Sequence, residues 1–350
     1  MTANATMSAV EPKASSRRLY RLIIISIVVL LFATVALFAW RGLEQHRVVE
    51  QFKAAGCFLT VAPMGPDLVS LGLDEKGVLW EAISTIENVR FTSDTLPIAL
   101  AHPAPFQQLN VAAFYQIQLD DDVLSRLFDS NSLGDAGSAR RANGILSNTR
   151  RLGFDEVGLN DDRMRCFSAM KNLEGFALLG GDVTDAGLAH LAGLPRLQTL
   201  SVRRVRLDGS ALSKFSASTP LTVVDFELTE FGDSALAELA KFSTLRDIRL
   251  RKTRVTDAGL TPLLKLPRLR RIDLDGTAVT DAGLDHLAKL GRIEEIDLSD
   301  TSITDAGIMK LAHHTELRNL KAYQTKITEA GVEAFHHYRR LRGMSCTLEW

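Results

Sequence analysis

Apolar side chains recur in a fixed frame, which is clearest over residues 269–290. Ile272 and Leu274 alternate with polar residues, whereas the leucines from Leu284 to Leu290 are spaced by three. Alternation predicts a short strand, and spacing by three predicts a short helix. We therefore expect each unit to be one strand followed by one helix, with both apolar faces turned to a shared core.

The helical half carries a repeated motif, Val-Thr-Asp-Ala-Gly-Leu, or a variant of it. Eight copies begin at Leu159, Val183, Leu207, Phe231, Val255, Val279, Ile303 and Ile327, a constant interval of 24 residues. One strand and one helix cannot bury their apolar faces alone, so successive units must stack, with neighbouring strands about 4.8 Å apart. The predicted fold is an α/β solenoid, a curved parallel sheet with short outer helices.

The repeated polar residues of each unit are expected to be structural. Thr280 and Asp281 stand where the helix begins, so they can cap free amides and complement the positive helix end. Gly283 should allow close approach of the neighbouring helix, and Thr277 occupies a turn. Asp273, one residue before the core position Leu274, is expected to face solvent.

The pattern weakens outside the regular units. Residues 119–127 fit the helical frame, and two segments resemble the strand frame, namely Phe106, Leu109 and Val111, and Ile86, Val89 and Phe91. The interval from Leu119 to Leu159 is 40 residues, so about sixteen extra residues around 131–148 must loop out or extend a helix. At the other end, Leu341, Met344 and Cys346 predict a final strand without a helix.

Residues 22–40 are uncharged and long enough for a helix to cross a bilayer core. A cleaved signal peptide is the alternative, but the run is long and the only small-x-small site is the weak Thr34-Val35-Ala36. Basic residues favour a cytoplasmic amino terminus with the repeats outside the cytoplasm. Those before the span are Lys13, Arg17, Arg18 and Arg21, and those after it are Arg41, Arg47 and Lys53.

The predicted organisation has five parts. They are a cytoplasmic tail (1–21), a transmembrane anchor (22–40), a juxtamembrane segment and amino-terminal cap (41–66), degenerate repeats with an insertion (67–148) and regular repeats (149–350). The candidate cap lies within residues 47–61, which are helix-like and then strand-like across Gly56.

Composition narrows the function classes. With 46% hydrophobic and 24% charged residues and a net charge of -1, the chain is neither disordered nor a polybasic nucleic-acid binder. Three scattered cysteines exclude a disulfide framework and a zinc site.

Two groups of residues are candidates for chemistry. Ser168 and Lys171 have the spacing of an acyl-transfer dyad but lack its companion motifs. His313 and His337 share a frame position in adjacent units, where they could hold a metal ion, but they lie at helix ends where solvated histidine is common. We expect no enzyme activity, no metal and no cofactor.

The repeated motif resembles the ribonuclease-inhibitor-like leucine-rich repeats, which occur in F-box substrate receptors and in bacterial membrane-anchored repeat proteins. The resemblance covers residues 149–350, and no F-box-like segment precedes it. It implies a leucine-rich-repeat solenoid that recognises proteins on the concave sheet. It implies no catalytic residue.

The strands are expected to show a densely charged face to solvent. Its residues are Arg203, Asp225, Glu227, Asp247, Arg249, Arg251, Arg271, Asp273, Asp275, Glu295, Asp297, Lys321 and Tyr323. These positions vary between units while the core repeats, as a specific binding surface requires. The predicted partner-binding residues are Arg249, Arg251, Arg271, Asp273, Asp275, Asp297 and Tyr323. A face of mutually paired charges without a ligand is the alternative interpretation.

The function predicted from these features is a membrane-anchored module that recognises a protein or peptide of unknown identity. The alternatives are a passive envelope scaffold and a hydrolase with an unrecognised site. Saturable capture of one protein by residues 41–350 would favour recognition over the scaffold.

Overall fold

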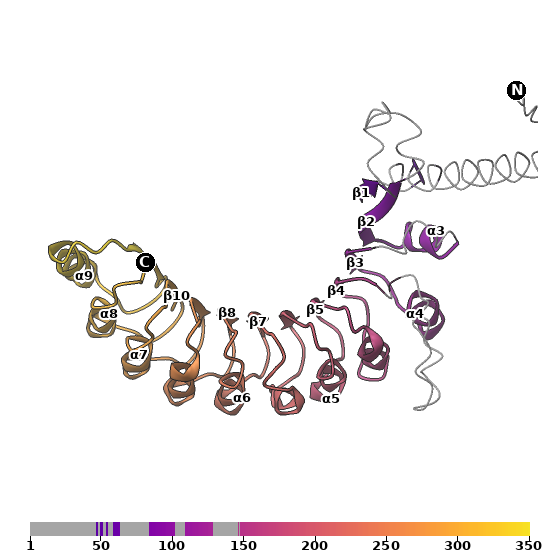
Figure 1. Ribbon diagram of the computed structural model, residues 1–350. Helices are drawn as coiled ribbons and strands as arrows, with labels where there is room; N and C mark the ends of the chain where they lie inside the picture. The colour runs from indigo at the N-terminus through magenta and orange to yellow at the C-terminus, as the bar shows by residue number, and fades with distance from the viewer. Residues whose placement is uncertain are drawn as a thin grey trace, which may run out of the picture. The chain divides into compact units, whose positions relative to one another are not determined.

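The computed structural model describes residues 47, 50–51, 54, 59–63, 84–101, 109–128, 146 and 148–350. Nearly all of these belong to one unit, formed by Phe52–Val61 and Ile86–Trp350. Within the described residues there are twelve strands, and each strand lies next to its neighbour in the sequence. In the unit, the sheet lines the inner side of an arc and the helices lie outside it (Figure 1).

The strands are β1 (Leu59–Pro63), β2 (Ser84–Phe91), β3 (Val111–Tyr115), β4 (Arg151–Asp155), β5 (Gly175–Leu179), β6 (Thr199–Arg203), β7 (Val223–Asp225), β8 (Asp247–Arg249), β9 (Arg271–Asp273), β10 (Glu295–Asp297), β11 (Asn319–Lys321) and β12 (Thr347–Glu349). The α-helices are α3 (Leu96–Ala101), α4 (Asp121–Phe128), α5 (Asp185–Leu188), α6 (Asp233–Leu239), α7 (Asp281–Leu287), α8 (Asp305–Leu311) and α9 (Glu329–Leu341). Short 3-10 helices are η4 (Arg163–Ala169), η5 (Ala189–Leu191), η6 (Ser210–Lys214) and η7 (Asp257–Lys265).

From β2 to β12 the sheet is parallel, and its register confirms the period over the regular units. From β4 to β11 each residue pairs with the residue 24 positions later, as Arg271 pairs with Glu295 and Glu295 with Asn319. Between β3 and β4 the offset is 40, since Val111 pairs with Arg151, which confirms the length of the expected insertion. Residues 131–145 of that insertion lie outside the described residues.

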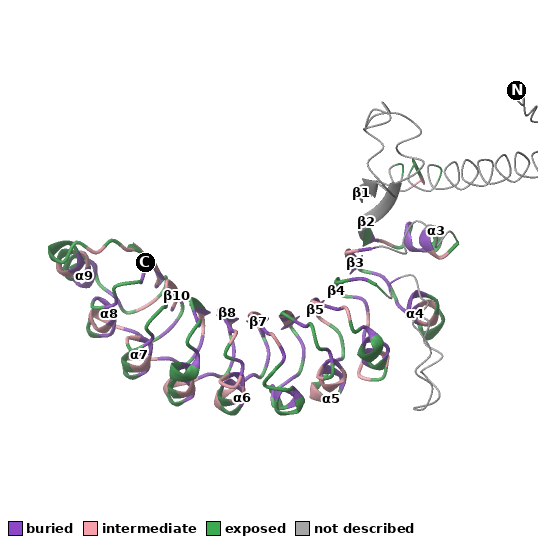
Figure 2. Ribbon diagram, viewed as in Figure 1, coloured by how far each residue is buried: buried purple, intermediate pink, exposed green. Residues whose placement is uncertain are grey.

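One continuous core runs between the sheet and the helices. Ile272, Leu274, Leu284 and Leu287 are fully buried, and the same positions are buried in the other regular units. In Figure 2 the sides of the helices and strands that face each other are buried, and the outer sides of the helices are exposed. The sequence pattern therefore predicted the core of the regular units correctly.

Phenylalanines replace leucine in the degenerate units and in the first regular unit. Phe91, Phe114 and Phe154 occupy the second strand position and stack across β2, β3 and β4, with ring centroids 5.0 Å and 5.2 Å apart. Val89 pairs with Ala112 and Phe91 with Phe114, so the frame of Ile86, Val89 and Phe91 is confirmed.

The frame proposed for the next strand was wrong by three residues. The core positions around β3 are Leu109, Ala112 and Phe114, all buried, rather than Phe106, Leu109 and Val111. Ala112 is small and the strand contains few branched residues, so the alternation that marks the other strands is hard to see here.

The repeated aspartate joins neighbouring units instead of capping its own helix. Asp257 accepts hydrogen bonds from the backbone N–H of Thr280 (2.8 Å) and from its hydroxyl (2.6 Å), 23 residues further on. The Thr280 hydroxyl then caps α7 by accepting from the N–H of Ala282, as expected. Asp161, Asp233, Asp281 and Asp305 make the same two bonds to Thr184, Thr256, Thr304 and Thr328.

This aspartate also explains the repeated glycine. A Cβ added to Gly283 would lie 2.4 Å from Oδ1 of Asp257, so close approach to the preceding unit requires glycine here. The turn threonine has its own role, because the buried hydroxyl of Thr277 donates to the carbonyl of Leu274 at 2.6 Å. The structural interpretation of the repeated polar residues is confirmed, with the aspartate reassigned.

The last strand lies four residues later than the sequence indicated. Leu348 pairs with Leu320, whereas Met344 had been expected at that position. The cause is α9, which continues for 13 residues to Leu341 and displaces the following strand. Leu341 is 74% exposed, so its assignment to the core was wrong.

The predicted anchor at residues 22–40 lies outside the described residues. Among the residues that are described, none of the helices combines the length and apolar character needed to span a bilayer. Helical backbone at Arg47, Glu50, Gln51 and Ala54, followed by β1, matches the helix-then-strand pattern of the candidate cap. Its role as a cap stays a prediction.

Candidate functional site

The outward strand positions of β6 to β11 form one charged surface, which we call the concave face. It is the side of the sheet turned away from the helices (Figure 1). All seven predicted partner-binding residues lie on it or at its margin, in β8, β9 and β10 or within two residues after them, and at Tyr323 after β11. The strand phase that placed them together is confirmed by the buried positions between them, such as Ile248, Ile272 and Ile296.

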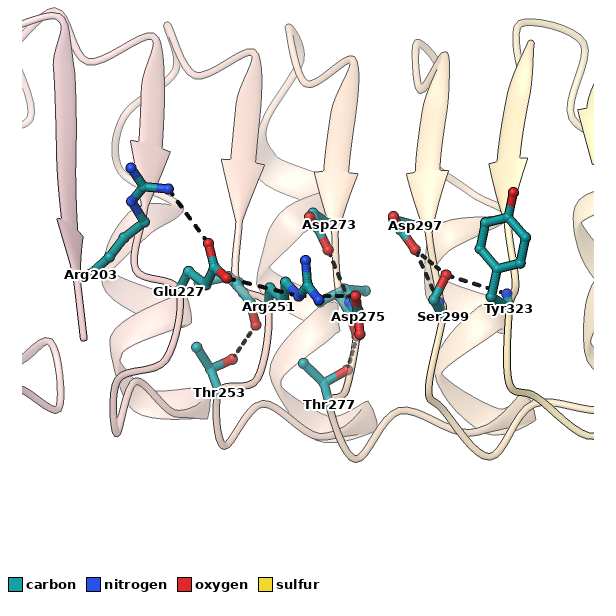
Figure 3. Close-up of polar contacts among 12 residues, drawn as sticks. Arg203, Glu227, Arg251, Thr253, Asp273, Asp275, Thr277, Asp297, Ser299 and Tyr323 are labelled. Carbon is teal, nitrogen blue, oxygen red and sulfur yellow. Dashed lines mark hydrogen bonds and ion pairs between the residues drawn. The ribbon is translucent and has the colours of Figure 1, made fainter. Parts of the chain in front are cut away.

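Arg251 belongs to a chain of ion pairs that crosses several units. Its Nε lies 3.0 Å from Asp275 and 3.8 Å from Glu227, and Glu227 lies 3.6 Å from Arg203 (Figure 3). Arg203 thus pairs with carboxylates of the next unit, and Arg251 is shared between the units on its two sides. Arg251 and Asp275 largely neutralise each other, which fits the alternative of a mutually paired surface better than a free cationic site.

The other two predicted arginines are also paired. Arg249 lies 2.8 Å from Asp247, and Arg271 lies 2.5 Å from Glu295 and 3.2 Å from Asp247. The hydrogen bond to Asp247 raises the pKa of Arg249, and the bond to Arg271 lowers the pKa of Glu295. Asp247 is itself buried, so the expectation that it faces solvent was wrong; the same holds for Asp225.

Asp273 and Asp297 differ from these residues because neither forms an ion pair with the described part of the chain. They stand side by side on β9 and β10, in register. Asp273 accepts a hydrogen bond from the N–H of Asp275 at 3.0 Å. Asp297 accepts from the N–H (3.0 Å) and the hydroxyl (2.7 Å) of Ser299. These three bonds appear in Figure 3, where the two carboxyl groups project from neighbouring strands.

Burial raises the pKa of Asp273 to about 6. The negative charges of Asp297 and Asp275 contribute to this rise, while the hydrogen bond from the N–H of Asp275 and the charge of Arg251 oppose it. Asp273 is half-buried, so its assignment as a solvent-facing residue was only partly correct. A carboxylate held this way is poorly solvated and forms no ion pair with the described residues, so a cation placed within hydrogen-bond distance of it would be favoured.

A hollow of about 240 Å³ opens over these two carboxylates. Its walls are Arg249, Arg271, Ile272, Asp273, Glu295, Ile296, Asp297, Asn319 and Lys321. Sequence reasoning did not single out Asn319, which occupies the strand position that pairs with Glu295. Its place in the frame, one residue before the core position Leu320, was the available signal.

Tyr323 lies next to Ser299 (Figure 3), two residues after Lys321 in the wall of this hollow. Its side chain is 45% exposed. The hydroxyl donates to Glu349 at 2.9 Å, and this bond raises the pKa of Tyr323. An exposed aromatic ring with one end fixed by a hydrogen bond suits a protein contact.

The catalytic and metal candidates are not supported by the local geometry. Lys171 donates to the backbone carbonyl of Ser168 and not to its hydroxyl. That hydroxyl donates to the backbone carbonyl of Arg165. Burial raises the pKa of the Cys166 thiol to about 12, so that thiol stays protonated. His313 contacts the hydroxyl of Tyr338. Within the described ranges, no group of three or more His, Cys, Asp or Glu side chains is arranged to hold a metal ion.

Comparison with known proteins supports the class that the fold defines. Residues 293–312 match the leucine-rich-repeat family, and this segment spans β10 and α8. No curated protein matches the sequence. The parallel sheet, the 24-residue register and the matched unit together support a leucine-rich-repeat architecture.

Two solved structures from Listeria monocytogenes are similar to the chain. One is an internalin, InlF, with 17% identity and a TM-score of 0.48, covering 72% of this chain and 69% of that one. The other is internalin C2, with 23% identity and a TM-score of 0.42, covering 59% of this chain and 89% of that one.

Proposed function

We propose that this protein is a single-pass membrane protein that presents a ribonuclease-inhibitor-like repeat module outside the cytoplasm. The module binds a protein or peptide on its concave face. The amino-terminal run at residues 22–40 and the basic residues before it support the anchor and its orientation. The repeat architecture supports protein recognition, because such solenoids display extended concave surfaces.

The observation that carries the binding proposal is the pair Asp273 and Asp297. The arginines of the concave face all pair with carboxylates within 4 Å, whereas these two carboxylates, and Lys321 on the strand next to Asp297, form no ion pair in the described part of the chain. Both carboxylates line the hollow of the concave face, and Tyr323 follows two residues after Lys321 in its wall. A lysine or arginine side chain of a protein ligand would supply the missing cation, with Tyr323 packing against its aliphatic part.

The passive scaffold remains the second candidate because so many of the concave charges pair internally. Three of the seven predicted residues, Arg249, Arg251 and Arg271, are held by carboxylates of their own sheet. Such pairing needs no ligand to explain it. No observation on the described residues favours the hydrolase.

The test is capture of membrane and exported proteins by immobilised residues 41–350. Saturable capture of one protein should weaken about tenfold or more when Asp273→Asn and Asp297→Asn are combined. Asparagine keeps the Oδ1 acceptor that both sites use, so the variant removes charge while preserving the local hydrogen bonds.

The matched control is Asp285→Asn with Asp300→Asn, since both carboxylates are exposed and lie off the concave face. Capture by this control should equal that of the wild type. Reversing Arg249 and Arg251 is a poorer test, because it would also break their bonds to Asp247 and Asp275. Equal capture by both double variants would remove the concave carboxylates from the binding site, and no saturable capture by the wild type would favour the scaffold.

A further inference from the structure

One backbone position in each unit, just beyond the strand, has an unusual conformation. Arg204, Leu228 and Lys252 have φ values of 56°, 56° and 53°. Each N–H donates to a carbonyl of the next unit, so the conformation belongs to the stacking pattern. It is unfavourable for any residue with a side chain, and all three side chains are exposed.

Leucine is an unusual residue for this backbone position. The other described units place glycine or a polar residue there, namely Gln116, Glu156, Gly180, Gly276, Asp300 and Gln324. Leu228 is 43% exposed, and asparagine or glycine would suit the left-handed backbone better. Neither packing nor backbone preference explains a leucine here, which points to a contact with another molecule.

Leu228 lies in a hollow of about 600 Å³ on the rim between the sheet and the helices. We call this hollow the basic rim. Its walls are Arg204, Val205, Arg206, Leu228, Thr229, Glu230, Lys252, Thr253 and Arg254. They come from the three loops that follow β6, β7 and β8, so residues 48 positions apart in the sequence border one surface.

The charge of the basic rim is strongly one-sided. Four cations line it against one carboxylate, Glu230, in a chain whose net charge is -1. Arg254 lies 3.4 Å from Glu230. Arg204, Arg206 and Lys252 make no ion pair with the described residues, in contrast to the paired arginines of the concave face.

We infer that the basic rim is a second interaction surface, which binds an acidic protein segment carrying an apolar side chain. The apolar side chain packs on Leu228, and carboxylates on either side of it meet Arg204 and Lys252. This surface has the opposite charge preference to the concave hollow at Asp273 and Asp297. It therefore does not depend on the function proposed for that hollow.

A nucleic acid fits the basic rim less well. No aromatic side chain lines it for bases to stack on, and an exposed leucine between the cations gives a phosphate backbone nothing to bind. Acidic protein segments, in contrast, combine carboxylates with apolar side chains. The rim therefore favours a protein segment over an oligonucleotide.

The experiment measures binding to the full-length protein in neutral detergent micelles by fluorescence anisotropy. The probes are a labelled peptide of aspartate and glutamate with one central leucine, the same peptide with serine in place of leucine, and a labelled oligothymidine. The leucine peptide should bind saturably and more tightly than the serine peptide, by about tenfold. Tighter binding of oligothymidine, equal binding of both peptides, or no binding would overturn the proposal.

Variants locate the site. Arg204→Gln with Lys252→Gln should weaken binding of the leucine peptide about tenfold or more, whereas Lys289→Gln with Arg292→Gln, at exposed cations elsewhere, should not. Leu228→Asn should weaken binding without lowering the melting temperature, since asparagine tolerates the left-handed backbone. Equal effects of the two double variants would contradict the assigned site.

The combined Asp273→Asn and Asp297→Asn variant separates this surface from the concave face. It should leave binding of the acidic leucine peptide unchanged. Loss of peptide binding in that variant would place the peptide on the concave face and overturn the assignment to the rim.

Discussion

At the scale of single residues, the main finding is that similar acidic side chains have different roles. Asp257 joins two units through Thr280, and Asp247 neutralises two arginines. Asp273 does neither and is left half-buried beside Asp297. A carboxylate that is poorly solvated and forms no ion pair lowers the stability of the fold. The presence of Asp273 is therefore better explained by a ligand than by the needs of the fold.

The raised pKa of Asp273 predicts how this cost depends on pH. The folded-state pKa is about 6 against an ordinary 3.8, so the folded protein binds the proton more tightly than the unfolded chain does. The contribution of this residue to the free energy of unfolding is fully present below about pH 4, and it is lost as the pH rises through the folded-state pKa of about 6. Asp273→Asn should thus be more stable than wild type at pH 7, by about 1 kcal/mol, and equal to it near pH 4.

Chemical denaturation of both proteins at the two pH values measures this difference. A wild type as stable as the variant at pH 7 would mean that Asp273 is well solvated and that the concave hollow holds no uncompensated charge.

At the scale of elements, neighbouring units are held by a repeated polar link as well as by the core. Asp257 accepts two hydrogen bonds from Thr280, so Asp257→Ala leaves an N–H and a hydroxyl without their partner. We expect it to lower the free energy of unfolding by about 1–2 kcal/mol. Glu333→Ala, at an exposed position of α9 whose carboxylate makes no ion pair with the described residues, should change it little. Thermal denaturation measures both, and equal losses would mean that the link adds nothing to stacking.

Helix α9 is held in place by the buried side chain of Arg339, which is 1% exposed, and not by the aspartate–threonine link alone. Its guanidinium donates to the carbonyls of His314 (2.7 Å), Leu317 (2.8 Å) and Ser345 (3.0 Å). Arg339→Met would leave these carbonyls without donors and should cost about 3 kcal/mol. Since each unit contacts only its neighbours, hydrogen exchange should rise in α9 and β12 and stay unchanged near β8. A uniform rise would contradict this local role.

The sequence predicted the regular elements because each unit has to solve the same packing problem. The predicted strand positions were wrong in two places where the packing differs from that of the regular units. At β3 the small Ala112 hides the alternation, and after α9 the strand is displaced because the helix is longer and carries the buried Arg339. For the site, strand phase was enough to place the seven residues on one face. It could not show which arginines are paired, because that depends on the paths of long side chains across neighbouring strands.

At the scale of the whole molecule, the repeats carry two surfaces for which we propose opposite charge preferences, and we propose that they stand outside the cytoplasm on one membrane anchor. The anchor predicts a simple topology result. Protease added to intact spheroplasts of an expressing bacterium should degrade the repeats, because they would lie outside the cytoplasmic membrane. Protection until lysis would reverse the orientation, and release of the repeats into the medium would indicate cleavage after the apolar run.

The central claim, that a protein occupies the concave face, is tested most directly by photo-crosslinking in the full-length protein. Tyr323→p-benzoylphenylalanine keeps an aromatic ring at the margin of the concave face, and Leu264→p-benzoylphenylalanine places the same group on the exposed side of η7. We predict that irradiation gives one discrete crosslinked protein from position 323 and none from position 264. Crosslinks from position 264 alone, or from neither position, would contradict the claim.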